Sequence, residues 1–193
     1  MTDMNDLCKQ VVAQLQRRGY EAVFVPTKDE AKALVLREAE QAASVGWGGS
    51  ETIKEIGARD EIAASGKEIR DHRSDADLFL LSANAVTRDG RVVNIDGNGN
   101  RVAASIFGPK RVVYVIGENK LVDGGLDEAV ERIKRSACPP NAKRLGRRTP
   151  CALTGKCADC DSSDRMCKVM AVFERCPTHT STKVIVVGEA LGY

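Results

Sequence analysis

The chain has 193 residues, of which 42% are hydrophobic, 29% are charged and only 4% are aromatic. This composition predicts a folded α/β protein whose core consists of aliphatic side chains, as in a buried parallel sheet. The 29 basic and 27 acidic residues leave a formal net charge of +2, which argues against a dedicated nucleic-acid-binding protein.

The predicted helices and strands alternate along most of the chain. Thr27, with Glu30 three residues later, forms a capping-box pattern that predicts the start of a helix. Alternation of strands and helices predicts a mostly parallel, doubly wound sheet. In chain order, the expected elements are a helix over 3–18, a strand over 20–25, a helix from 27 to about 42, a strand over 44–47, a helix over 51–56, a partly helical stretch over 58–77, strands over 77–83, 90–96 and 111–117, a helix over 126–137 and a strand over 182–187.

The composition changes after Cys138. Three prolines within 139–150 predict breaks in regular structure, and residues 143–148 are expected to form a basic loop. We therefore expect a single α/β domain over 1–193, with a cysteine-rich insert at about 149–176 ahead of the final strand.

Five of the seven cysteines lie between residues 151 and 176. In a reducing compartment such clustering indicates metal binding or redox chemistry. Four of them follow the spacing C-x5-C-x2-C-x6-C, in which the C-x2-C pair lets two thiolates turn onto one metal centre. The predicted metal ligands are Cys151, Cys157, Cys160 and Cys167.

Four thiolates suit either a tetrahedral zinc ion or a [4Fe–4S] cluster. All four lie in one short loop, without the two separated C-x2-C pairs of a zinc ribbon, and this favours the cluster over zinc. A loop of free thiols is the remaining alternative. Cys176 is left open as a further ligand, whereas Cys8 and Cys138 are expected to be buried structural cysteines.

The run Gly48-Gly49-Ser50-x-Thr52 lies between a predicted strand and a predicted helix. Glycines permit a tight turn and close approach of a ligand, and the two hydroxyls add hydrogen-bonding groups, so a phosphate or carboxylate seat is expected. The alternative is an ordinary helix cap at Ser50.

A second run, over residues 94–101, is rich in Gly, Asn and Asp. Asp96 could act as a base or bind a hydroxyl, and Arg101 could bind a carboxylate with two parallel hydrogen bonds. The alternative is a solvated loop. The preceding Asp89-Gly90 predicts a tight hairpin turn.

Four strings carry a resemblance to a known family: GWGGSETIKEIG (46–57), SANAVTRDGRVVNIDGNGNRVAASIFGPKRVVYVIGENKLV (82–122), NAKRLG (141–146) and TPCALTGKCADCDSSDRMC (149–167). They cover nearly the whole chain and resemble the LUD-domain family, which includes the bacterial lactate utilisation protein C. The chain is similar to the stand-alone branch that carries the cysteine segment. The resemblance implies a fold similar to that of ribose-5-phosphate isomerase, glucosamine-6-phosphate deaminase and CoA transferases.

The resemblance also implies a ligand site. Those isomerase relatives often have an acidic residue where this chain has Asn84, and a neutral amide cannot act as a general base. Asp96 or Glu55 would have to serve instead, and both are candidate catalytic residues. The implied ligand-binding residues are Gly48, Gly49, Ser50, Thr52, Asn84, Asp96, Gly97, Asn100 and Arg101.

The leading function hypothesis is an iron–sulfur accessory or electron-transfer component of the utilisation of lactate or related 2-hydroxy acids. One alternative is an enzyme that acts on a small phosphorylated or carboxylated sugar acid. The other is a ligand-binding protein with a structural zinc. The expected partners are a small anionic ligand, flavin or iron–sulfur oxidoreductase subunits and a second copy of the chain, without nucleic acid or membrane. With no bilayer-length apolar run and no secretory signal pattern, the expected location is the cytoplasm.

Overall fold

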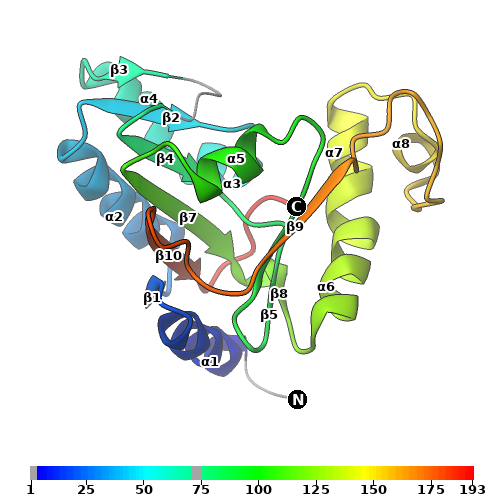
Figure 1. Cartoon of the computed structure of the whole chain (residues 1–193), viewed down its shortest axis with the longest axis horizontal. Helices are drawn as coiled ribbons and strands as arrows, with labels where there is room; N and C mark the ends of the chain where they lie inside the picture. The colour runs from blue at the N-terminus through cyan, green and yellow to red at the C-terminus, as the bar shows by residue number, and fades with distance from the viewer. Residues whose placement is uncertain (1–3, 71–74) are drawn as a thin grey trace.

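The computed structural model describes residues 4–70 and 75–193, and its centre is a six-stranded parallel sheet (Figure 1). Every pairing in this main sheet is parallel, which confirms the predicted α/β architecture with a mostly parallel central sheet. Parallel pairing places the carboxyl ends of the strands at one edge. The strand order is β1 (Glu21–Val25), β10 (Ser181–Val187), β7 (Arg111–Gly117), β4 (Leu78–Leu81), β2 (Ser44–Trp47) and β3 (Glu68–Ile69).

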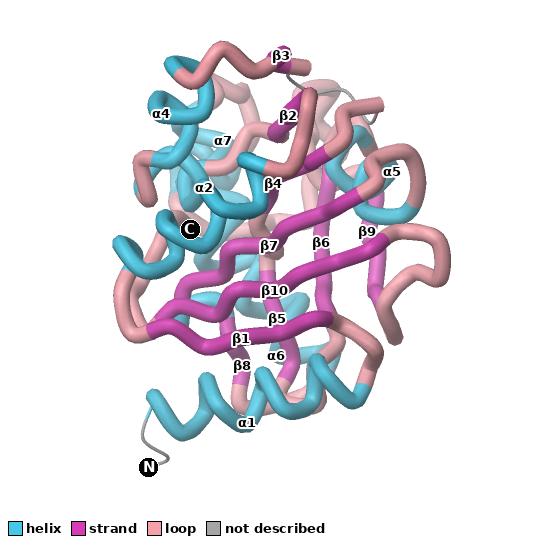
Figure 2. The backbone as a smooth tube through the Cα atoms, turned by 90° about the vertical axis from the view of Figure 1, so that its left-hand side faces the viewer, coloured by secondary structure: helices cyan, strands magenta, loops and turns pink. Residues whose placement is uncertain are grey.

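A second, four-stranded sheet was not expected from the sequence. Its order is β8 (Leu121–Val122), β5 (Ala85–Thr87), β6 (Val92–Asp96) and β9 (Val169–Phe173). Figure 2 shows these strands running across the direction of the main-sheet strands. Strand β9 falls inside the segment 149–176, where the sequence predicted only a cysteine-rich insert, and pairs antiparallel with β6.

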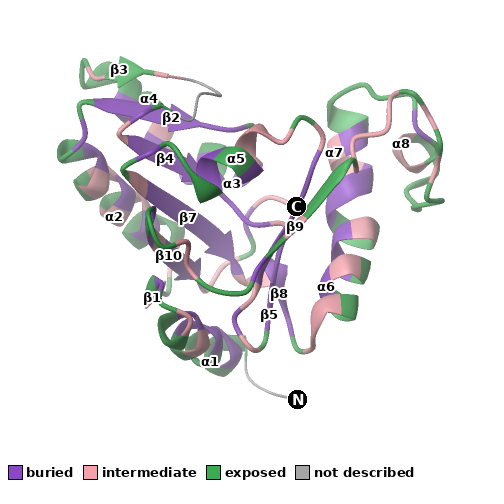
Figure 3. Ribbon diagram, viewed as in Figure 1, coloured by how far each residue is buried: buried purple, intermediate pink, exposed green. Residues whose placement is uncertain are grey.

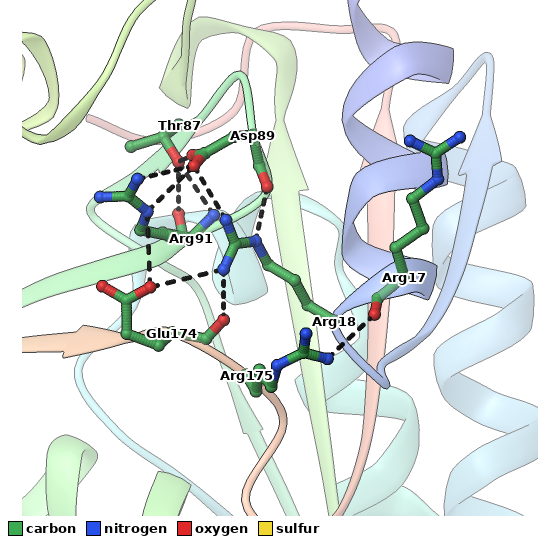
Figure 4. Close-up of polar contacts among 7 residues, drawn as sticks. All are labelled: Arg17, Arg18, Thr87, Asp89, Arg91, Glu174 and Arg175. Atoms are coloured by element: carbon green, nitrogen blue, oxygen red, sulfur yellow. Dashed lines mark hydrogen bonds and ion pairs between the residues drawn. The ribbon is translucent and has the colours of Figure 1, made fainter.

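The hairpin turn between β5 and β6 is tied to the end of helix α1 (Met4–Arg17). Gly90 has φ +85°, and its N–H donates to the Thr87 carbonyl at 2.8 Å, which confirms the predicted turn. Arg18 donates to the backbone oxygen of Asp89 at 2.6 Å and to its carboxylate at 2.8 Å (Figure 4). Glu174, just after β9, accepts from Arg18 as well, so the turn, the helix end and β9 are held together.

Different elements pack against the two faces of the main sheet. Helix α1 buries Leu7, Val11, Val12 and Leu15, as the spacing predicted, and packs with the second sheet against one face; the predicted start of this helix at residue 3 lies outside the described residues. The other face is covered by α2 (Lys28–Glu40), α3 (Glu51–Glu55) and α4 (Ala58–Ala64). Thr27 caps α2 by accepting the Glu30 N–H at 3.3 Å.

Helices lie where the prolines predicted breaks. A helix α6 (Leu126–Arg132) continues through a π-helical turn (Ile133–Ala137) into α7 (Cys138–Arg144), and α8 (Pro150–Thr154) follows. The prolines occupy first-turn positions of α7 and α8, where the missing N–H costs no hydrogen bond. These residues therefore start helices, and the predicted basic loop over 143–148 begins inside α7.

The main sheet and the cysteine segment differ in how far their residues are buried. Figure 3 shows the main sheet buried, whereas the turns around α8 and much of β9 are exposed. Helix α6 and the π-turn pack on the far side of the second sheet and form a third apolar cluster that ends at Cys138. Within the described part of the chain, no helix is long and apolar enough to span a bilayer.

Candidate functional site

A cavity of about 550 Å³ lies at the carboxyl edge of the main sheet. Its walls come from the turns after β2 and β4, from the segment between β6 and α5 (Asn100–Ile106), from α7 and from residues 163–168. In open α/β sheets, ligands bind outside the carboxyl ends of the strands. Eight of the predicted ligand residues line this cavity: Gly49, Ser50, Thr52, Asn84, Asp96, Gly97, Asn100 and Arg101.

Two predicted residues do not line the cavity. A Cβ atom on Gly48 would lie 2.6 Å from Cγ of Arg101, so Gly48 provides the space in which the Arg101 side chain lies. Glu55 accepts the Gly192 N–H at 2.7 Å and so fixes the carboxyl-terminal segment. Glu55 therefore makes a structural contact. It does not line the cavity, where a base would meet a ligand.

Ser50 is occupied as a helix cap. Its Oγ accepts the Ile53 N–H at 3.3 Å, the arrangement expected from the alternative explanation of the glycine run. Helix α3 has only five residues, so its dipole adds little to anion binding. The hydroxyl of Thr52 lies deeper and donates to the Leu191 carbonyl at 3.1 Å.

Asp96 uses its carboxylate to organise the start of α5. It accepts backbone N–H groups from Gly97 at 2.8 Å, Arg101 at 3.1 Å and Val102 at 3.3 Å. The Arg101 guanidinium donates to the Ile95 carbonyl at 2.9 Å and has its Nε 3.7 Å from the Asp96 carboxylate. This buried carboxylate therefore holds the start of α5 and positions Arg101.

Asn84 joins the second sheet to the cavity wall. Its side-chain oxygen accepts the Ile95 N–H at 2.9 Å, and its own N–H donates to the Asn94 side-chain oxygen at 3.0 Å. These two contacts fix Asn84 against strand β6.

Among the cavity residues that the sequence did not single out is Lys120. Only 4% of Lys120 is exposed, and its Nζ donates to Thr52 Oγ1 at 2.6 Å and to Ser82 Oγ at 2.9 Å. Burial, together with the nearby Arg132 and Arg101 guanidinium groups, lowers the pKa of Lys120 to about 7. The only signal available in the sequence was its place just after the strand 111–117, at the edge where ligands bind.

Five cysteines surround a second, smaller cavity of about 20 Å³ beside the first. The four predicted ligands are joined there by Cys138, which the sequence assigned to a structural role. The Sγ atoms of Cys138 and Cys167 are 3.3 Å apart. This contact raises the pKa of Cys138, aided by burial, and lowers that of Cys167 to about 7.

The remaining thiols are arranged around this cavity without converging on one point. Among the described residues, no three Cys, His, Asp or Glu side chains are placed to hold a single metal ion. Arg165 donates to the carbonyls of Cys160 at 2.8 Å and Cys167 at 2.9 Å and so holds the segment together. Cys176 lies elsewhere, against Gly19 and the main-sheet core.

The two cavities share a wall. Cys138, Arg165, Met166 and Cys167 line both of them. Residues of the smaller cavity therefore form part of the lining of the larger one.

This arrangement defines an α/β protein with a polar cavity at the carboxyl edge of a parallel sheet and a cysteine centre beside it. A family model of the LUD domain matches residues 8–187, so the chain belongs to the LUD-domain family. At the level of the family, this relates the chain to lactate utilisation.

One solved structure shares the fold. It is the crystal structure of a DUF162 family protein from Deinococcus radiodurans, which is similar to this chain with a TM-score of 0.60 and 16% sequence identity, over 97% of this chain and 99% of that one. No curated protein matches the chain.

Proposed function

We propose that this protein is an iron–sulfur accessory or electron-transfer component in the utilisation of lactate or related 2-hydroxy acids. The observation that carries the proposal is the gathering of five cysteine side chains around one small cavity, in a chain of the LUD-domain family. A [4Fe–4S] cluster is held by four thiolates and supplies one-electron transfer when bound. Flavin or iron–sulfur oxidoreductase subunits would be the electron-transfer partners.

The spread of the thiols supports a cluster over a single zinc ion. Each thiolate of a cluster binds a different iron, so the ligands need not converge on one point as they do around zinc. Lys134 and Arg165 line the same cavity and offset the negative charge of the thiolates. A cluster is larger than this cavity, so loading requires the exposed turn around Cys157 to move outward.

Anaerobic purification followed by iron, sulfide and zinc analysis and a visible spectrum tests this proposal. We expect a brown protein with about four irons and matching sulfide per chain. Cys160→Ser should lose most of the iron and the visible absorbance, whereas the matched control Cys176→Ser should keep both, because Cys176 lies outside the cysteine cavity. A colourless protein with one zinc per chain would replace this proposal with the zinc alternative.

A second candidate function comes from the larger cavity. We propose that it binds a small carboxylated or phosphorylated acid, in keeping with the likeness to sugar-phosphate isomerases that the sequence suggested. Its lining carries the basic residues Arg101, Lys120, Arg144, Arg165 and Lys168 among others, a composition that favours an anion.

Gly48→Ala is expected to weaken anion binding while leaving the fold intact. The added methyl group would lie 2.6 Å from Cγ of Arg101, and a flexible side chain yields more easily than backbone. Calorimetric titration with pyruvate, lactate and inorganic phosphate should show at least about a tenfold loss of affinity, the size expected when one charged contact is displaced. Gly125→Ala is the control, since Gly125 does not line the cavity and its Cβ would meet only Glu128 Oε2, at 3.8 Å. Equal affinity in Gly48→Ala and wild-type protein would remove Arg101 from the binding site.

A further inference from the structure

Lys120 is a buried cation without an anionic partner. No carboxylate in residues 4–70 or 75–193 forms an ion pair with its Nζ, and its two hydrogen-bond partners are the neutral hydroxyls of Thr52 and Ser82. Buried charges are normally paired, because removing a charge from water is costly. A lysine that is 4% exposed and lines a cavity is therefore placed for a partner that comes from outside the chain.

The surroundings of Lys120 strengthen this argument. Arg132, from α6, is also buried, and among the described residues it donates to the carbonyls of Asn119 and Asn84 and to the backbone oxygen of Tyr193. Arg101, from α5, adds a third positive charge, and Glu55, from α3, is the acidic group that opposes these charges by raising the pKa of Lys120. Glu55 is already bonded to the Gly192 N–H, and Arg101 has the Asp96 carboxylate 3.7 Å from its Nε, so within the described residues Lys120 is the cation of this group that lacks a carboxylate at ion-pair distance.

We propose that Lys120 binds the carboxylate or phosphate oxygens of a small anion in the larger cavity, beside the Ser82 hydroxyl. The inference rests on the proposed ligand-binding role of that cavity and names the group that recognises the ligand. The shared chemistry is a compact oxyanion, because an ammonium group has three N–H donors, of which two meet Thr52 and Ser82 and the third remains for an anion oxygen.

Anion binding by Lys120 is coupled to the uptake of a proton by the lysine side chain. In the unliganded protein the pKa of Lys120 is about 7, and a bound anion favours the charged ammonium and raises that pKa. At pH values below 7 the lysine is already charged, so binding takes up no proton there. Above pH 7, binding takes up one proton, and affinity falls by about tenfold per pH unit until the pKa of the bound state is reached.

Isothermal titration calorimetry of the full chain tests the inference. Pyruvate, lactate and inorganic phosphate are titrated at about pH 8, where an amine with a pKa near 7 is mostly neutral. Two buffers with different ionisation enthalpies are compared, so that the heat reports the number of protons taken up. We expect close to one proton per anion in wild-type protein. Preference for pyruvate or lactate would identify a carboxylate ligand, and preference for phosphate a phosphorylated one.

Lys120→Met should lose both the binding, by more than about tenfold, and the proton uptake. Lys54→Met is the matched control, because Lys54 lies exposed on α3 away from the cavity and should bind as wild type does. Ser82→Ala keeps the amine and should retain the proton uptake with weaker binding, which covers the case in which Lys120→Met does not fold. Anion binding that survives in Lys120→Met, or that takes up no proton in wild-type protein, would overturn the role of Lys120. The ligand-binding role of the cavity would still stand. A wild-type protein that binds none of the three anions would overturn the ligand-binding role as well.

Discussion

Cys138→Ser is expected to deplete the protein of iron as strongly as Cys160→Ser, although Cys138 lies outside the run of four regularly spaced cysteines. The Cys138 thiol lines the cysteine cavity, 3.3 Å from Cys167 Sγ. Its replacement removes one of the thiolates closest to the protein interior, and a serine hydroxyl is a poor ligand for iron in its place. Iron per chain and the visible spectrum after anaerobic purification measure the effect.

The iron content of Cys138→Ser, compared with that of Cys151→Ser, decides which four of the five cysteines bind the cluster. Full iron content in Cys138→Ser together with its loss in Cys151→Ser would return the ligand set to the four cysteines of the spaced motif. Thermal unfolding of each variant, followed by circular dichroism after removal of the metal, serves as the control for folding.

The second large effect concerns the hairpin turn. Gly90→Ala is expected to lower the free energy of unfolding by about 3 kcal/mol, from the cost of a Cβ at positive φ together with overpacking. Gly90 has φ +85°, and an added Cβ would lie 2.9 Å from backbone atoms of both Gln14 and Leu15 in α1. Backbone cannot yield as a side-chain end does, so the turn and the helix would have to separate. Urea or thermal unfolding measures the change.

Gly66→Ala is the matched control for this prediction. Gly66 also has positive φ, +77°, but an added Cβ would meet nothing within 4 Å. Only the backbone cost remains, about 1 kcal/mol. Equal destabilisation by the two substitutions would show that the close approach of the turn to α1 contributes nothing.

The sequence predicted those parts of the fold that depend on local patterns. The helical spacing of Leu7, Val11 and Leu15, the Thr27 cap and the apolar run 111–117 each determine an element from neighbouring residues alone. The second sheet escaped prediction because β5 and β8 are three and two residues long. Strands this short carry no periodicity, and their pairing depends on contacts between distant segments.

In the candidate site, too, the sequence predicted only the residues that a local pattern marks. Glycine and asparagine turns have a sequence signature, and eight of the residues predicted from them line the larger cavity. Lys120 has no such signature, since a lysine in a polar turn is normally exposed. Cys138 became part of the cysteine cavity only because the prolines after it start a helix and because α7 packs against the later cysteine segment.

The wall shared by the two cavities has a thermodynamic consequence. Cys138 and Cys167 face both spaces, so a change of oxidation or metal content on one side alters the surface offered to a ligand on the other. Linkage is reciprocal: if metal loading changes the affinity for the anion by some factor, the anion changes the affinity for the metal by the same factor. The supply of small acid in the cell and the maturation state of the cysteine centre would then regulate each other through the wall that Cys138 and residues 165–167 form between the two cavities.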